Sequence, residues 1–229
     1  MGGLLRRRGM MAARSSEKPS IDEYVSDSMV LWLDAVQNTR SGHDAGAAEW
    51  EDLSGNGRDY TYDAANIINA DHFLANGRAI TSSLALPTDG TIKTVELVVG
   101  FIASGSAQVF IPLGNRFGTT SIGTYNSTTP YVLFQATSGS TFTQHVFERV
   151  ADADIHTYNS DGYVDGASVP VIHARAGWAT VAATRLFGYS SNTSNVPACK
   201  ICALRLYSRQ LTAEEIAHNA ALDAARFGG

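Results

Sequence analysis

The fold is decided by three short segments: Leu31-Trp32-Leu33-Asp34, Trp50-Glu51-Asp52-Leu53-Ser54-Gly55-Asn56-Gly57 and Ile201-Cys202-Ala203-Leu204-Arg205-Leu206-Tyr207. The first and last are rich in apolar residues, which is typical of buried strands. Residues 52–57 are mostly Asp, Ser, Asn and Gly, which favour turns because they bond nearby amides or accept left-handed backbone. We therefore expect a buried strand near each end of the chain and a tight turn soon after the first one.

The chain between these segments has the pattern of successive short strands. Residues Thr91–Ile102 are the clearest, with Val95, Leu97, Val99 and Phe101 on one face. Further strands are expected at Ala107–Leu113, Thr119–Tyr125, Tyr131–Thr137 and Phe142–Arg149. This regular spacing is typical of a sandwich or barrel. Asp161-Gly162 and Asp165-Gly166 each fit a tight hairpin turn. No helical period separates the strands, which argues against a parallel βαβ architecture.

A helix is predicted only at the end of the chain. Thr212 suits the N-cap and Glu215 the third helical position, which together form a capping box. Leu211 and Ile216 occupy the positions of a hydrophobic staple around it. We expect the helix to cover the sandwich with one apolar stripe, formed by Ile216, Ala220, Ala224 and Phe227.

Length and composition favour one folded domain with a sizeable core. The chain has 229 residues, of which 44% are apolar and 17% charged, so disorder is not expected. All-β sandwiches often use this length for a single domain. We place the domain at residues 21–229 and a separate arm at residues 1–20.

The opening and closing segments resemble those of laminin-G-like (concanavalin A-like) jelly-roll domains, and the whole pattern is most similar to proteins encoded by phages and prophages of gut Bacteroidetes. The resemblance covers both ends of the chain well. In the middle of the chain it consists only of the regular spacing of the expected strands. It implies an all-β, antiparallel jelly-roll sandwich with one C-terminal helix. It also implies a protein that binds or builds and seldom catalyses.

The N-terminal arm is basic, whereas the rest of the chain is acidic. Residues 1–18 carry Arg6, Arg7, Arg8, Arg14 and Lys18 against Glu17, a net charge of +4, so the remainder carries −9 to reach the total of −5. Such an arm can dock on acidic neighbours in an assembly, or contact nucleic acid or a membrane surface, or remain an idle solvated tail. Three adjacent arginines without interleaved aromatics would bind nucleic acid without sequence specificity.

These features favour a non-enzymatic structural or decoration subunit of a virion or similar assembly. The arm would dock on a neighbouring subunit, and we expect self-association, the usual state of such subunits. The arm lacks the apolar core of a secretory signal, and no run is long enough to span a membrane. We therefore predict a location in the virion, or in the host cytoplasm during assembly.

The alternative function is a carbohydrate-binding adhesin module. A flat aromatic ring stacks on the apolar face of a sugar, and Trp178 is the tryptophan that best fits an exposed position. Asn192 would lie in a loop at the same edge of the sandwich. Packing in the core is the competing interpretation of Trp178, and it is the preferred one for Trp32 and Trp50.

No metal site is predicted, and calcium at the 52–57 turn is kept as a weak alternative. Asp52, Asn56 and Asp59 offer the hard oxygen ligands that calcium prefers. The resemblance implies further carboxylates just before the Arg-x-Tyr of the last strand, where this chain instead has Cys202 and Ala203. A turn satisfied by its own hydrogen bonds is the preferred interpretation.

No catalytic residues are predicted. The carboxylates at Glu49, Glu51 and Asp52, and at Glu148, Asp152 and Asp154, do not alternate along one strand as those of jelly-roll glucanases do. A divergent glycosidase or lyase stays a third, minor alternative.

The two cysteines, Cys199 and Cys202, have the spacing of a redox or half-zinc motif. On a strand, however, they would point to opposite faces, too far apart for a disulfide. We expect one thiol in the core and one facing outward.

Overall fold

The computed structural model describes residues 18–63, 67–74, 80–87, 92–101, 110–112, 120–126, 130–138, 141–148, 154–170, 173–174, 185–187 and 199–228. Side chains are described within 18–100, 154–170, 186–187 and 200–228. The basic arm with Arg6, Arg7, Arg8 and Arg14 lies outside the described residues, as do Trp178 and Asn192.

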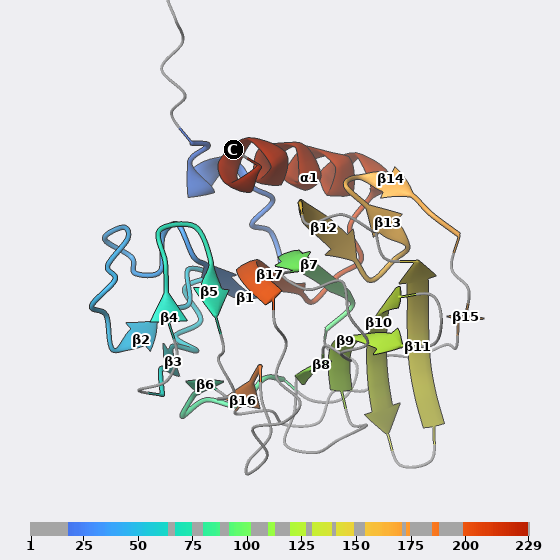
Figure 1. Ribbon diagram of the computed structural model, residues 1–229, viewed down its shortest axis with the longest axis horizontal. Coiled ribbons are helices and arrows are strands. Elements are labelled where there is room, and N and C mark those ends of the chain that lie inside the picture. Colours follow the sequence, from blue (N-terminus) through green and yellow to red (C-terminus); the bar gives the residue numbers. More distant parts are fainter. Residues whose placement is uncertain are drawn as a thin grey trace, which may run out of the picture.

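The described residues form an antiparallel all-β fold that ends in one α-helix, as predicted (Figure 1). The elements of the first half of the chain are η1 (Ile21–Glu23), β1 (Met29–Asp34), β2 (Glu49–Trp50), β3 (Tyr60–Thr61), β4 (Ile67–Ile68), β5 (Phe73–Leu74), β6 (Ile80–Thr81), β7 (Thr94–Phe101) and β8 (Phe110–Pro112). Those of the second half are β9 (Thr120–Asn126), β10 (Pro130–Ser138), β11 (Thr141–Glu148), β12 (Ile155–Asn159), β13 (Tyr163–Val164), β14 (Ala167–Ser168), β15 (His173–Ala174), β16 (Arg185–Leu186), β17 (Cys199–Tyr207) and α1 (Ala213–Phe227).

The last strand, β17, is the centre of the largest sheet. That sheet has the order β14-β13-β12-β7-β17-β5-β4, and β1 also pairs with β17. Leu204 of β17 lies opposite Leu33 of β1 on one side and Leu97 of β7 on the other. The two sequence segments that bracket the fold are therefore hydrogen-bonded neighbours. Two smaller sheets have the orders β15-β11-β10-β9-β8 and β16-β6-β3-β2.

The main core lies between the largest sheet and the sheet that contains β2, β3, β6 and β16. Alternate residues of the central strands, such as Leu33, Leu97 and Leu204, are fully or almost fully buried in it. Trp50 and Tyr60 enter the same core from the second sheet. Burial of aromatic and branched side chains from two facing sheets is the principal stabilising contribution in a sandwich.

Helix α1 covers the opposite face of the largest sheet, near β12, β7 and β17 (Figure 1). The capping box of Thr212 and Glu215 is present, so this prediction is confirmed. Leu211 and Ile216 pack in one cluster with Trp32 and Tyr207, which confirms the staple and places Trp32 in the core.

The buried face of α1 differs from the predicted apolar stripe. Ala224 is exposed, whereas Asn219, Asp223 and Arg226 are buried beside Ile216, Ala220 and Phe227. The prediction was wrong on this point because the sheet surface below the helix is itself polar. A buried polar side chain is tolerated where it finds a charged or hydrogen-bonding partner.

Cys202 lies at a shift in the register between β17 and β7, which falls between Ile201 and Ala203. A bulge of this kind places two successive residues on one face. Cys202 and Ala203 accordingly share a buried cluster with Phe227 on the helix side of the sheet. The side chain of Cys199 lies outside those described, so the predicted outward thiol stays a prediction.

The β13–β14 hairpin turns at Asp165-Gly166, as predicted. Both residues have positive φ, 50° and 78°, the combination that a two-residue type I′ turn requires. The turn also approaches the helix closely. A Cβ placed on Gly166 would lie 2.9 Å from the Cα of Ala217.

Candidate functional site

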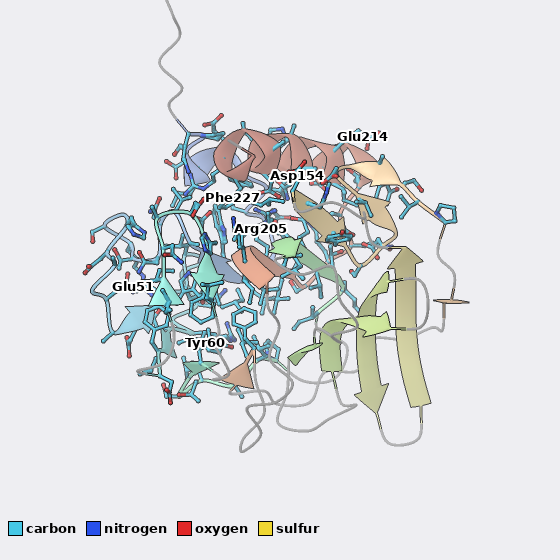
Figure 2. All side chains as sticks on the ribbon, viewed as in Figure 1. Glu51, Tyr60, Asp154, Arg205, Glu214 and Phe227 are labelled. Carbon is cyan, nitrogen blue, oxygen red and sulfur yellow. The ribbon has the colours of Figure 1, made fainter. Side chains whose placement is uncertain are left out.

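A fully buried arginine connects α1 to the sheet. Arg205 of β17 donates from Nε to Oε2 of Glu96 at 3.0 Å, and from Nη1 and Nη2 to the two carboxylate oxygens of Asp223 at 2.9 and 2.5 Å. The side chains of Arg205 and Glu96 have no exposed surface. Figure 2 shows Arg205 beneath α1, at the level of the central strands. The geometry is that of a bidentate, charge-assisted pair, one of the stronger polar contacts in proteins.

Glu96 of β7 is the second acid of this network. Its carboxylate also accepts hydrogen bonds from Nδ2 of Asn159 at 3.1 Å, from Nδ2 of Asn219 at 2.9 Å and from the hydroxyl of Tyr207 at 3.4 Å. Burial raises the pKa of Glu96, and the adjacent Arg205 opposes that rise. The carboxylate of Glu96 thus has hydrogen-bond donors from both the sheet and α1.

A second buried ion pair holds the C-terminal end of α1. Arg226 donates from Nε and Nη2 to the carboxylate oxygens of Asp34, at 2.9 and 3.0 Å. Its Nη1 donates to the carbonyl oxygen of Pro19. The helix end, the end of β1 and the chain that leads into η1 therefore meet at one guanidinium. The paired side chains of both networks are almost completely buried, and each network positions α1.

The candidate site is a cavity of about 620 Å³ beside the C-terminal end of α1. Its larger apolar lining residues are Val98, Ile155 and Phe227, of which only Ile155 is partly exposed. Its charged and polar residues are Asp154, His156, Thr157, Asp165, Lys200 and Asp223. In Figure 2, Asp154 is labelled just below α1, near β12. Pockets that bind small ligands combine these two kinds of surface, an apolar body with a few oriented polar groups.

Hydrogen bonds fix the polar groups on one wall of this cavity. Nδ1 of His156 lies 2.7 Å from Oδ2 of Asp165. The other oxygen of Asp165 accepts from the backbone amide of Thr157 at 2.9 Å. The hydroxyl of Thr157 donates to Asp223 at 2.8 Å, and Asp223 is held by Arg205. The buried network therefore orients the groups that a ligand would contact.

A second cavity, of about 500 Å³, lies by the β3–β4 region and is lined by Ala45, Ala47, Ala48, Thr61, Tyr62, Asp63, Ile67 and Ile68. Its lining is mainly small and apolar. We place the candidate site at the first cavity because its polar groups are more numerous and are held by an ordered chain of hydrogen bonds.

Asp52, one of the three residues considered for calcium, lies in the 52–57 turn and is fully buried. Its Oδ1 accepts from the amides of Trp32 and Ser54 at 3.0 and 2.9 Å, and its Oδ2 accepts from the amide of Arg58 at 3.1 Å. Gly55 and Gly57 have the positive φ expected of the turn. The carboxylate thus joins the turn to β1.

The other two candidate calcium ligands also have internal partners. Asp59 forms an ion pair with Arg40 at 2.6 Å. The amide nitrogen of Asn56 donates to the carbonyls of Met29 and Val30 at 3.0 and 3.2 Å. A calcium ion would have to compete with these contacts, and the calcium hypothesis stays a prediction. Among the described residues, no group of three or more His, Cys, Asp and Glu is arranged to hold a metal.

The residues that line the candidate site were not identified from the sequence, apart from Asp154, which was considered only as a catalytic carboxylate. One signal was present. Asn219, Asp223 and Arg226 recur at helical spacing on α1, and a polar stripe on the covered side of a helix indicates buried partners. In the part of the chain that the structure describes, no helix is long and apolar enough to cross a membrane.

No protein-family model matches the sequence, and no curated protein matches it. Solved structures resemble the fold. The binding domain of botulinum neurotoxin DC in complex with rat synaptotagmin II has a TM-score of 0.61 at 12% identity, over 86% of this chain and 52% of that chain. Botulinum neurotoxin type C, whose cell entry depends on interaction with two ganglioside molecules, has 0.55 at 13%, over 86% and 52%. A mutant of Trypanosoma rangeli sialidase that displays trans-sialidase activity has 0.51 at 16%, over 90% and 34%.

At these identities the likeness shows the fold alone. It agrees with the predicted jelly-roll sandwich, and the laminin-G and phage associations stay predictions. The chain spans about half the length of the two neurotoxin chains and about a third of the sialidase.

Proposed function

We propose that this protein is a glycan-binding jelly-roll domain whose ligand occupies the cavity beside the C-terminal end of α1. The observation that carries the proposal is the lining of that cavity, in which His156, Asp165 and Thr157 are joined in one hydrogen-bonded chain next to the apolar side chain of Phe227. Non-catalytic binding is favoured over the virion role that the sequence first indicated.

The chemistry of the lining suits a sugar. Sugar hydroxyls both donate and accept hydrogen bonds, and carboxylate, imidazole and ammonium groups supply the matching partners. The C–H face of a sugar ring packs on apolar surface, here that of the partly exposed Ile155, because Val98 and Phe227 are almost completely buried. The volume of about 620 Å³ lies in the range of ligand pockets and is large enough for a short oligosaccharide.

Two of the solved structures that share the fold support a glycan ligand. Cell entry of one similar neurotoxin depends on interaction with two ganglioside molecules, and the similar sialidase mutant displays trans-sialidase activity. This chain matches only part of each of those two proteins. The ganglioside interaction and the trans-sialidase activity are therefore properties of those whole proteins. The proposal therefore depends mainly on the cavity.

Glycan binding is tested by titrating the full chain against a panel of oligosaccharides by calorimetry. We expect saturable binding that Asp154→Ala weakens about tenfold, the loss expected for one hydrogen bond to a charged group. Glu214→Ala is the matched control, because Glu214 is an exposed acid at the other end of α1 (Figure 2). Binding that Asp154→Ala leaves unchanged would place the ligand elsewhere.

The same samples test the enzymatic alternative. His156 and Asp165 form a paired imidazole and carboxylate, an arrangement that hydrolases also use. Chromatography of the glycans after long incubation with the protein separates the two functions. Intact glycans accompany a binding domain, whereas new reducing ends that disappear in His156→Gln would make the protein an enzyme.

The assembly hypothesis stays a second candidate because of the charge contrast between the arm and the body. Its test compares the light-scattering mass of the full chain with that of the full-length variant Arg6→Gln, Arg7→Gln, Arg8→Gln, Arg14→Gln. Assembly of the wild type alone would assign the arm a docking role. Full-length substitution is preferable to truncation at Ile21, because Ser20 caps η1 and Pro19 contacts Arg226.

A further inference from the structure

We infer that Glu96 of β7 is a proton-binding site of the folded protein, and that α1 is held more firmly to the sheet when the proton is bound. More acids than bases are buried beneath α1, and one proton removes the imbalance. No ligand of the cavity takes part in this effect.

The charged side chains beneath α1 do not balance. Among the described residues, Arg205 is shared by two acids, Glu96 at 3.0 Å and Asp223 at 2.5 Å. Arg226 is paired with one acid, Asp34, at 2.9 Å. The side chains of all five residues are at most 4% exposed. Two positive and three negative charges leave a net charge of −1, and an unmatched charge is costly in a buried site.

The other groups that face Glu96 and Arg205 do not remove this negative charge. The guanidinium of Arg205 stays protonated in proteins. Tyr207 and Tyr24, which lie beside Glu96 and Arg205, stay neutral because burial raises the pKa of both hydroxyls. The remaining partners of Glu96 are amides that do not titrate, Asn159 of β12 and Asn219 of α1. The imbalance is therefore relieved by a proton on one of the carboxylates.

Glu96 is the acid that can take up this proton at the least cost. Asp223 binds Arg205 through both carboxylate oxygens, and Asp34 binds Arg226 in the same way. A proton on either aspartate would break a bidentate pair, whereas a proton on Glu96 leaves two balanced pairs. Glu96 accepts from Arg205 only at Oε2. Its Oε1 accepts one hydrogen bond from the described residues, at 3.1 Å, and keeps a second lone pair for a proton.

The bound proton stabilises the fold. Burial has the largest effect on Glu96 and raises its pKa above the ordinary value of 4.5, although Arg205 and the two asparagine amides act in the opposite direction. The folded protein then binds the proton more tightly than the unfolded chain does. The stabilisation is complete below the ordinary value and is lost as the pH rises through the folded-state pKa. Because Asp223 and Phe227 of α1 line the cavity, the same proton also steadies one wall of the cavity.

The test compares the wild type with Glu96→Gln, whose side chain has nearly the same shape and carries no charge at any pH. Urea denaturation of both full chains, from pH 4.5 upward, gives the ratio of their unfolding equilibrium constants. The constant of the wild type should rise about tenfold relative to that of the variant for each pH unit, up to the folded-state pKa, because the two differ by one bound proton. Glu214→Gln removes an exposed acid from the same helix and is the matched control, which should not show this dependence.

A second measurement uses the wild type alone and does not require that Glu96→Gln folds. Carbon NMR of the full chain, labelled at the glutamate side-chain carboxyls, should show a resonance that titrates clearly above 4.5. A ratio of unfolding constants that does not change with pH would overturn the inference. So would a ratio that changes in the opposite direction, since Arg205 would then keep Glu96 ionised. The absence of any glutamate resonance that titrates above the ordinary value would overturn it as well.

Discussion

Removal of the charge on Asp223 should loosen the attachment of α1 to the sheet. Its carboxylate accepts hydrogen bonds from the hydroxyls of Tyr24 and Thr157 at 3.0 and 2.8 Å, and two from Arg205. Asp223→Asn keeps the volume but turns an amide donor toward a guanidinium or a hydroxyl. Loss of one partner from a buried ion pair typically costs about 3–5 kcal/mol. We expect a loss of this size, because Arg205 is completely buried and retains only Glu96 as a charged partner.

The free energy of unfolding is measured by urea denaturation, followed by far-ultraviolet circular dichroism and by tryptophan fluorescence. Trp32 lies in the cluster below α1, so its emission reports on this contact. Glu214→Gln removes an exposed acid from the same helix and should change the stability by no more than about 1 kcal/mol. A double-mutant cycle of Asp223→Asn with Arg205→Met should show a coupling well above the error of the measurement.

A change below about 1 kcal/mol for Asp223→Asn would refute this reasoning, because it would equal the loss of a single ordinary hydrogen bond. The reasoning would also be refuted if the effects of Asp223→Asn and Arg205→Met on the free energy of unfolding were additive in the double mutant. In either case α1 would be held mainly by Ile216, Phe227 and their apolar neighbours.

Three further predictions concern the elements around α1. Gly166→Ala should destabilise the fold by more than Gly57→Ala. Both residues have positive φ, which costs about 1–2 kcal/mol for alanine, but only at Gly166 would the new Cβ also lie 2.9 Å from the Cα of Ala217. Equal midpoints of urea denaturation for the two variants would contradict this prediction. The hydrogen bonds from Arg209 and Thr212 lower the pKa of Glu215 to about 2. Since this folded-state pKa lies below the ordinary value, the ionised carboxylate stabilises the fold at neutral pH. The difference in free energy of unfolding between the wild type and Glu215→Gln should therefore vanish as the pH falls through about 2. A difference that does not change with pH would exclude this mechanism. Leu211→Asp should lower the stability by about 2–5 kcal/mol, because it removes a nearly buried apolar side chain from the staple; an unchanged melting temperature would show that the staple is dispensable.

The candidate site shows where prediction from the sequence ended. Residue type pointed to Trp178 and Asn192, which lie outside the described residues, whereas the described cavity uses His156, Asp165 and Lys200. These three residues are scattered along the chain with no shared motif. His, Asp and Lys are all common on protein surfaces. These three residues form the lining of a cavity only because the fold brings them together.

The sequence by itself determined the local features of this protein. The capping box at Thr212, the left-handed glycines of the 52–57 turn, the Asp165-Gly166 hairpin and the alternation of Val95, Leu97 and Val99 all depend on residues within a few positions of one another. Local sterics and local hydrogen bonds are enough to specify them. The antiparallel, all-β class followed from the same patterns.

Only the tertiary structure decided which charges are buried together. Arg205 and Glu96 are 109 positions apart, and Arg226 and Asp34 are 192 positions apart. These pairs form because β7, β17 and β1 are neighbours in one sheet, with α1 packed across their outer face. Local patterns carry no information on which distant strands pair, so they could not show that these polar residues form the buried network that orients the cavity.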